Sequence, residues 1–228
     1  MKKTLTSVIC AFTAMATAIA GQQDVQENGI FWNFIYGGDA IPSQDEPARF
    51  SLDRHGENPV EEVASAEAGN SVLRQTIGSG GWGWRIVGPV PLLREAPCLV
   101  LEMRARIVSG EGFLLGAELR NGETGGANLR ISTQEIAFGS DSRTAPIREE
   151  IANDFHIYRM VVDSSGAKLY LDGKPDPIKV VAPTPVVGVW VAFGNFGALD
   201  GAGIVEYDYV KWAWSDESPL PPGVSPEN

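Results

Sequence analysis

The sequence predicts an all-β protein built as a sandwich of two antiparallel sheets. Short stretches in which apolar and polar residues alternate recur along the chain, separated by Gly, Pro, Asn and Asp. The clearest is FHIYRMVVDSSGAKLYLDG at 155–173, two alternating runs joined by a Ser-Ser-Gly turn, as in a β-hairpin. Both faces of its first run are partly apolar, which indicates a strand inside a two-layer structure. Because helical periodicity is nearly absent, a sandwich or jelly roll is favoured over an α/β fold.

The first segment of the chain, 1–20, is predicted to be a secretory signal peptide. Lys2 and Lys3 precede an uncharged run that ends in Ala-Ile-Ala at 18–20, the small-x-small pattern that signal peptidase requires. The run is short and is interrupted by Thr and Ser, so it does not predict a membrane-spanning helix, and no other stretch does. We therefore expect export, with the mature protein in the periplasm or outside the cell.

Strands are expected wherever β-branched and aromatic residues alternate with polar ones between turn residues. These stretches are 30–36, 71–77, 82–87, 98–108, 112–119, 128–132, 135–138, 155–163, 167–172, 186–193 and 203–214. Only 60–68 is compatible with a helix, and flanking Pro59 and Gly69 limit it to a short surface element. We expect one domain over 21–215, followed by a disordered tail at 216–228, where four prolines occur without an apolar pattern.

Charge and cysteine content restrict the partners and the chemistry. The net charge of −11 becomes −13 once Lys2 and Lys3 leave with the signal peptide. Such acidity argues against nucleic acid and anionic membrane surfaces as partners. Only Cys98 remains after processing, so no intramolecular disulfide is expected, and its setting in APCLVLEM predicts a buried small hydrophobic residue. We expect a monomer.

The hairpin and the last predicted strand together carry a resemblance to a known family. DFHIYRMVVDSSGAKLYLDGK at 154–174 is similar to the F-H-x-Y hairpin of lichenase and laminarinase type β-glucanases, and VEYDYVKW at 205–212 is similar to their closing strand. The chain thus resembles the concanavalin A-like lectin and glucanase superfamily, including its LamG-like members. The resemblance implies a jelly roll, and a structural calcium ion held by Asp208 together with backbone carbonyls of the N-terminal region.

The same resemblance argues against glycoside hydrolysis. In the β-glucanases a strand just before the hairpin carries E-x-D-x-E or E-x-D-x-x-E, which places nucleophile and general acid on one face. Here ISTQEIAFGSDS at 131–142 has Glu135 in the first place, but Ala137 and Gly139 or Ser140 stand where the other carboxylates belong. A retaining glycosidase needs two carboxyl groups about 5 Å apart, and one glutamate does not supply both.

A strip of polar residues is predicted on the concave sheet face. In the strands at 98–108, 112–119 and 128–132 the odd-numbered positions are apolar, which leaves polar even-numbered residues on the opposite side. The strip consists of Glu102, Arg104, Arg106, Glu118, Arg120 and Arg130, with His156 and Tyr158 beside it. It is either a solvated face with many ion pairs or a glycan-binding groove, in which the arginine guanidinium groups are suited to bidentate binding of carboxylate or sulfate groups.

Two tryptophans form a second candidate site. Trp82 and Trp84 in GSGGWGWRI are flanked by glycine, so their rings are suited to stacking on a sugar. They also share a parity with Ile86, which favours packing in the core. Both interpretations stay open at the level of the sequence.

Three functions from different classes are compatible with these features. The favoured one is a noncatalytic carbohydrate-binding, lectin-like domain that recognises a polysaccharide or other glycan. The second is a polysaccharide lyase acting on a uronate by β-elimination, with His156 or Tyr158 abstracting the proton while Arg104 and Arg120 neutralise the carboxylate. The third is a structural cell-envelope domain without a small ligand.

Overall fold

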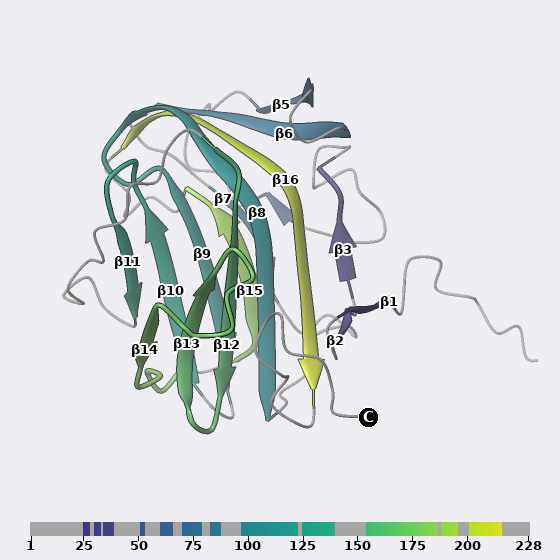
Figure 1. Ribbon diagram of the computed structural model, residues 1–228, viewed down its shortest axis with the longest axis vertical. Helices are drawn as coiled ribbons and strands as arrows, with labels where there is room; N and C mark the ends of the chain where they lie inside the picture. The colour runs from purple at the N-terminus through teal and green to yellow at the C-terminus, as the bar shows by residue number, and fades with distance from the viewer. Residues whose placement is uncertain are drawn as a thin grey trace, which may run out of the picture.

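The computed structural model consists of two antiparallel β-sheets packed face to face (Figure 1). It describes residues 25–27, 30–32, 34–38, 51–52, 60–65, 70–78, 83–87, 97–122, 125–139, 154–186, 188–195 and 201–215. Every regular element in these ranges is a strand, which confirms the predicted all-β sandwich. They contain no helix long and apolar enough to cross a membrane. The predicted signal peptide and the tail at 216–228 lie outside the described residues.

The first layer is a six-stranded sheet that will hold the candidate site. Its strands, in spatial order, are β11 (Ile136–Gly139), β10 (Gly125–Ile131), β9 (Leu115–Asn121), β15 (Trp190–Gly194), β7 (Gly83–Val87) and β4 (Ser51–Leu52). All neighbours are antiparallel. In Figure 1 this sheet lies behind the other.

The second layer is an eight-stranded sheet dominated by two long strands. Its order is β14 (Lys179–Val181), β13 (Gly166–Leu171), β12 (His156–Asp163), β8 (Cys98–Glu111), β16 (Ala202–Ser215), β6 (Asn70–Ile77) and β5 (Val60–Ser65), with β3 (Phe34–Tyr36) paired to β16. The register between β8 and β16 shifts at Ile204/Val205 and at Tyr207/Tyr209. Such bulges bend a strand, and both strands arch over the top of the molecule in Figure 1.

The main core fills the space between the sheets. Odd-numbered residues of β8, such as Leu101 and Met103, meet odd-numbered residues of β9, such as Ala117 and Leu119, as the alternation predicted. A smaller second core lies on the outer face of the eight-stranded sheet, where β2 (Ile30–Trp32), which forms a hairpin with β1 (Val25–Glu27), covers it. This second core consists of Ile30, Trp32, Cys98, Val100, Val161, Tyr170 and Ala213, and its Cys98 is fully buried as predicted.

The prediction that 60–68 is compatible with a helix is wrong, because Val60–Ser65 forms strand β5. It pairs with β6 from Val60 opposite Gln75 to Ser65 opposite Asn70. Backbone hydrogen bonding to a neighbouring strand overrides the weak local preference of a charged sequence. The described short strands β1, β4 and β14 were not predicted either.

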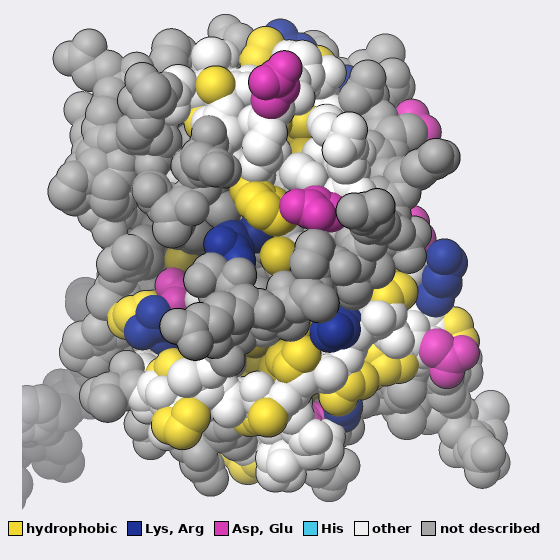
Figure 2. Space-filling model, turned by 90° about the vertical axis from the view of Figure 1, so that its left-hand side faces the viewer, with side chains coloured by type: hydrophobic (Ala, Val, Ile, Leu, Met, Phe, Trp, Pro, Cys, Tyr) yellow, Lys and Arg dark blue, Asp and Glu magenta, His cyan; other side chains and the backbone are white. Residues whose placement is uncertain are grey.

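The side of the molecule that carries the edge strands β11 and β14 faces the viewer in Figure 2. Dark blue Lys and Arg side chains and magenta Asp and Glu side chains are both visible there among hydrophobic ones.

Candidate functional site

The predicted polar strip does not lie on one sheet face. One half belongs to β8 in the eight-stranded sheet, and the other to β9 and β10 in the six-stranded sheet. The odd-numbered residues of all three strands point into the shared core, so the even-numbered ones point to opposite outer surfaces of the sandwich. The prediction of a single strip is therefore wrong. The two groups are Glu102, Arg104 and Arg106 on β8, and Glu118, Arg120 and Arg130 on β9 and β10.

Glu102 is the centre of a buried ion-pair network on the outer face of the eight-stranded sheet. It is only 3% exposed, and its Oε2 accepts a hydrogen bond from Arg159 Nε at 2.5 Å. Its Oε1 accepts from Lys211 Nζ and from the Tyr209 hydroxyl, each at 3.0 Å. Trp32 covers the network, with its ring centroid 4.5 Å from Lys211 Nζ. A carboxylate that is covered and fully paired in this way stabilises the fold and is closed to a ligand.

Arg106 is paired on the same face with a second buried carboxylate. Its Nε donates to Glu206 Oε2 at 2.7 Å, while Arg74 Nε donates to Glu206 Oε1 at 2.9 Å. Glu206 is 1% exposed. The guanidinium carbons of Arg104 and Arg106 each lie 4.6 Å from the centroid of the Phe155 ring. A role of these two arginines in ligand binding stays a prediction, and their present partners are protein groups.

Asp208 is buried next to Arg104, whose guanidinium donates to Asp208 Oδ2. Its Oδ1 is buried and has no hydrogen-bond partner. Gly38, at φ +72°, brings the N-terminal region so close that a Cβ there would lie 2.6 Å from the Asp208 carbonyl oxygen. Within the described ranges, however, no three His, Cys, Asp or Glu side chains gather around a metal position. With one carboxylate, already paired with a cation, these residues alone do not fit calcium, and the ion stays a prediction.

His156 and Tyr158 lie on β12 but have different surroundings. Tyr158 is 1% exposed in the main core, and burial, with a smaller contribution from Asp172, raises the pKa of its phenol. His156 Nδ1 is 2.9 Å from Asp172 Oδ2, and Asp172 Oδ1 accepts from the Ile157 backbone N–H at 2.9 Å. These contacts join the start of β12 to the residue that follows β13, at the end of the hairpin away from its turn.

The four residues assigned to a lyase do not meet in one site. Arg104 and Arg120 point to opposite outer faces, whereas Tyr158 lies in the core between the sheets. Abstraction of a proton α to a carboxylate requires the base and the neutralising cation to contact the same sugar. The described geometry therefore does not support the lyase mechanism.

The side chains of the two predicted stacking tryptophans lie outside what the structure describes. Trp82 lies outside the described residues, and for Trp84 only the backbone position is described, on β7 opposite Phe193. Another tryptophan, Trp190 on β15, lies half-buried on the outer face of the six-stranded sheet, in register with Arg120 of β9.

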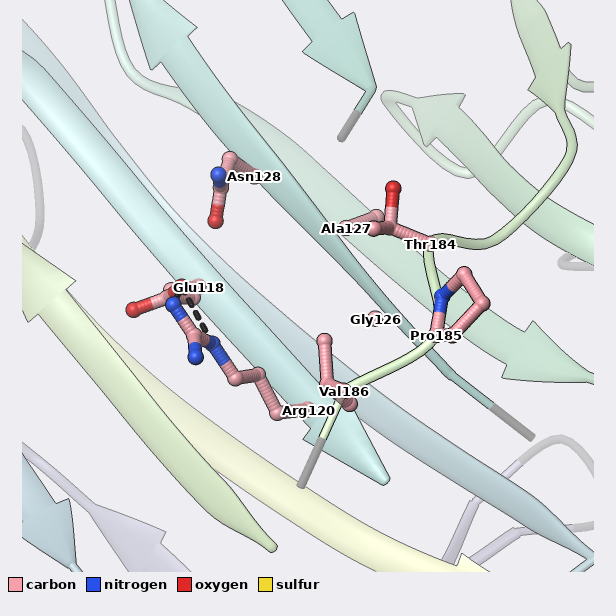
Figure 3. A pocket seen from close by; sticks show the side chains of 8 residues that line it. All are labelled: Glu118, Arg120, Gly126, Ala127, Asn128, Thr184, Pro185 and Val186. Carbon is pink, nitrogen blue, oxygen red and sulfur yellow. Dashed lines mark hydrogen bonds and ion pairs between the residues drawn. The ribbon is translucent and has the colours of Figure 1, made fainter. Parts of the chain in front are cut away.

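A cavity of about 400 Å³ opens on the outer face of the six-stranded sheet (Figure 3). Strands β9 and β10 form its floor, and the segment at 184–186 forms a wall. Thr184 fixes this wall through two backbone hydrogen bonds with Gly126, of 2.9 and 3.1 Å. The lining residues are Glu118, Arg120, Gly126, Ala127, Asn128, Thr184, Pro185 and Val186.

The polar groups of the cavity come from neighbouring strand positions. Arg120 Nε donates to Glu118 Oε1 at 2.6 Å, and Figure 3 shows these two side chains meeting, with Asn128 on the adjacent strand. The Arg120 guanidinium carbon is 3.6 Å from the centroid of the Trp190 ring, so the arginine is held from two sides. Asn128, in register with Glu118, has no hydrogen bond from its side-chain amide in the described structure.

Sequence reasoning identified both charged residues that line the cavity, Glu118 and Arg120, and missed the uncharged ones. Asn128 shares the parity of Arg130 and could have been included on that ground. Thr184 follows a proline in an irregular segment, and no local pattern predicts that it reaches across to β10.

Comparison with known proteins yields similarity at the level of structure only. No protein-family model matches the sequence, and no curated protein is detectably similar to it. A carbohydrate esterase from a Shiga toxin-encoding bacteriophage is similar over 82% of this chain and 100% of its own, with a TM-score of 0.55 and 12% identity. A Trypanosoma rangeli sialidase is similar over 82% of this chain and 31% of its own, with a TM-score of 0.54 and 15% identity.

A β-1,3-glucanase from Mycobacterium marinum is also similar, over 80% of this chain and 98% of its own, with a TM-score of 0.50 and 15% identity. Identities this low establish the fold and nothing finer. They agree with the predicted fold, a sandwich of two antiparallel sheets.

Proposed function

We propose that this protein is a noncatalytic carbohydrate-binding domain and that the cavity on the six-stranded sheet is its glycan site. The observation that carries the proposal is the convergence of Glu118, Arg120 and Asn128 at an open cavity of about 400 Å³. This volume is typical of ligand sites. A carboxylate, a guanidinium and an amide together offer planar donors and acceptors, and neighbouring sugar hydroxyls need both.

The structural relatives support a carbohydrate as the ligand. The three reported above are named as an esterase, a sialidase and a glucanase, all of which act on carbohydrates. Their catalysis does not transfer at such low identity. In the described cavity Glu118 is the one lining carboxylate, and it is paired with Arg120, whereas glycoside hydrolysis in most families uses two carboxyl groups.

The test is a glycan array, followed by calorimetric titration of the strongest oligosaccharide with variants of the cavity. We expect Asn128→Ala and Glu118→Gln each to weaken binding by about tenfold, the value of one lost hydrogen bond of about 1.4 kcal/mol. Lys174→Ala, an exposed change at the far end of the hairpin, is the control and should bind like the parent protein.

Two results would contradict the proposal. Unchanged affinity in both cavity variants would place the glycan elsewhere on the protein. A blank array would favour a structural envelope domain without a small ligand.

The domain is proposed to act after export, which rests on the signal-peptide pattern at 1–20. N-terminal sequencing of the protein recovered from the periplasm or the culture medium should then begin near Gly21. A mature protein that retains Met1 would contradict this.

A further inference from the structure

We infer that the glycan is acidic and that Arg130 binds its carboxylate or sulfate group. This inference rests on the proposed function and adds the class of ligand. Arg130 lies on β10 two residues beyond Asn128, so both side chains project from the same face of the sheet about 7 Å apart. It therefore stands at the edge of the cavity, one step along the strand.

Arg130 differs from the other described arginines in that its guanidinium is not bonded to a carboxylate. Among arginines whose side chains the structure describes, it is the one with no ion pair and no hydrogen bond, its sole recorded contact being the Phe113 ring at 5.3 Å. The remaining five are each bonded to a carboxylate. They are Arg74, Arg104, Arg106, Arg120 and Arg159.

The strand neighbours of Arg130 have short side chains. In register it stands opposite Gly116 on β9 and Ala137 on β11, which place no long side chain next to the guanidinium. The chain has 29 acidic and 18 basic residues, so carboxylates to pair with are abundant, yet none of those among the described residues is bonded to Arg130. A guanidinium that is not bonded to a protein carboxylate is suited to bidentate binding of a carboxylate or sulfate, through two parallel N–H···O hydrogen bonds.

The cavity and Arg130 thus bind different groups of the same ligand. Asn128 and the Glu118–Arg120 pair face ring hydroxyls, which neutral and acidic sugars share. Arg130 faces the group that only an acidic sugar carries. Loss of Arg130 should therefore change the preference between ligands, whereas loss of Asn128 should weaken all of them alike.

The experiment compares matched polysaccharides that differ in charge alone. Polygalacturonate is titrated against its methyl ester, and dextran sulfate against dextran, with the parent protein, Arg130→Gln and Arg130→Lys. We expect the parent to bind the charged member of one pair at least tenfold more tightly, and the pair concerned identifies carboxylate or sulfate as the group. Arg130→Gln should lose this preference without weaker binding of the neutral member, and Arg130→Lys should keep part of it. High salt should reduce the preference.

Lys174→Gln is the matched control, because it removes one positive charge at an exposed position that does not line the cavity. Its preference should equal that of the parent. Equal melting temperatures of the variants would show that folding is intact.

Failure of this inference is distinguishable from failure of the proposed function. If charged and neutral members bind equally and Asn128→Ala weakens both, Arg130 does not read charge and the glycan site stands. A preference for charge that survives Arg130→Gln also overturns the inference. If no polysaccharide or array glycan binds, both proposals fall.

Discussion

The two outer faces of the sandwich carry similar charged residues, but these residues differ in burial and in pairing. On the eight-stranded sheet, Glu102, Arg159 and Lys211 are each less than 8% exposed and are bonded to one another beneath Trp32. On the six-stranded sheet, charged groups line an open cavity, and Arg130 has no charged partner among the residues that the structure describes. Arginines and glutamates at alternating positions are therefore no mark of a binding site by themselves. The distinguishing property is whether these charged groups are buried and paired within the protein or are reached by solvent.

The difference has a physical origin in what covers each sheet. Strand β2 lays Ile30 and Trp32 on the eight-stranded sheet, which removes water from its charged groups. Buried charges without partners are costly, so every one there must be paired. Where water still reaches the sheet, an unpaired arginine costs little and can serve a ligand.

The largest expected effect is that of removing this cover. Trp32→Ala should lower the free energy of unfolding by about 3–5 kcal/mol, because it opens a void and exposes the Glu102 network to water. Trp190→Ala, on the open face, should cost about 1–2 kcal/mol, since its ring is only partly buried. Urea unfolding of both variants measures the difference. Equal costs would show that the two faces do not differ in burial energy.

The second comparison concerns the two glutamates. Glu102→Gln should destabilise the protein by about 3 kcal/mol, because it removes the carboxylate that is bonded to the buried cations Arg159 and Lys211. Glu118→Gln should change stability by less than about 1 kcal/mol, since its pair with Arg120 is reached by solvent. Thermal and urea unfolding test both values. A Glu118 variant as unstable as the Glu102 variant would mean that the cavity is structurally closed.

The smallest expected effect concerns Cys98, in the second core under β2. Burial, with a smaller contribution from Asp163, raises the pKa of its thiol from 9.0 to about 12. Below pH 9 the thiol is protonated in both folded and unfolded chains. Above pH 9 only the unfolded chain ionises, so stability is lost between pH 9 and pH 12. By pH 10 this loss should reach about 1 kcal/mol, at 1.36 kcal/mol per pKa unit.

Comparing the parent with Cys98→Ala isolates this contribution, because the buried tyrosines, whose pKa values are also raised, titrate in both proteins. Urea unfolding at pH 8 and pH 10 should show a smaller drop for Cys98→Ala. Parallel drops would mean that the second core admits water to the thiol.

The sequence predicted the layers and the inward-facing residues well, because alternation is a local property. The parity of Leu101 and Met103 alone places them in the core, and the structure agrees. The element at 60–68 was mistaken because its strand state depends on pairing with β6, which no local pattern encodes.

The candidate site was predicted only in part for the same reason. Parity states that Arg104 and Arg120 both face away from a core, but it does not state which sheet each strand enters. Whether an arginine has a partner is also nonlocal. Arg104 bonds to Asp208, 104 positions further along the chain, whereas Arg130 bonds to no carboxylate within the described ranges, and the two look alike in the sequence.

The position of β16 has a consequence for how the protein folds. It lies between β8 and β6 in the middle of the eight-stranded sheet, as Figure 1 shows in yellow, although its residues come late in the chain. Until 202–215 have emerged from the ribosome or crossed a membrane, β8 and β6 each lack a neighbour and expose an unpaired edge. Pairing between such distant segments is slow to form. The eight-stranded sheet can therefore close only as a late step, once almost the whole described chain has been delivered.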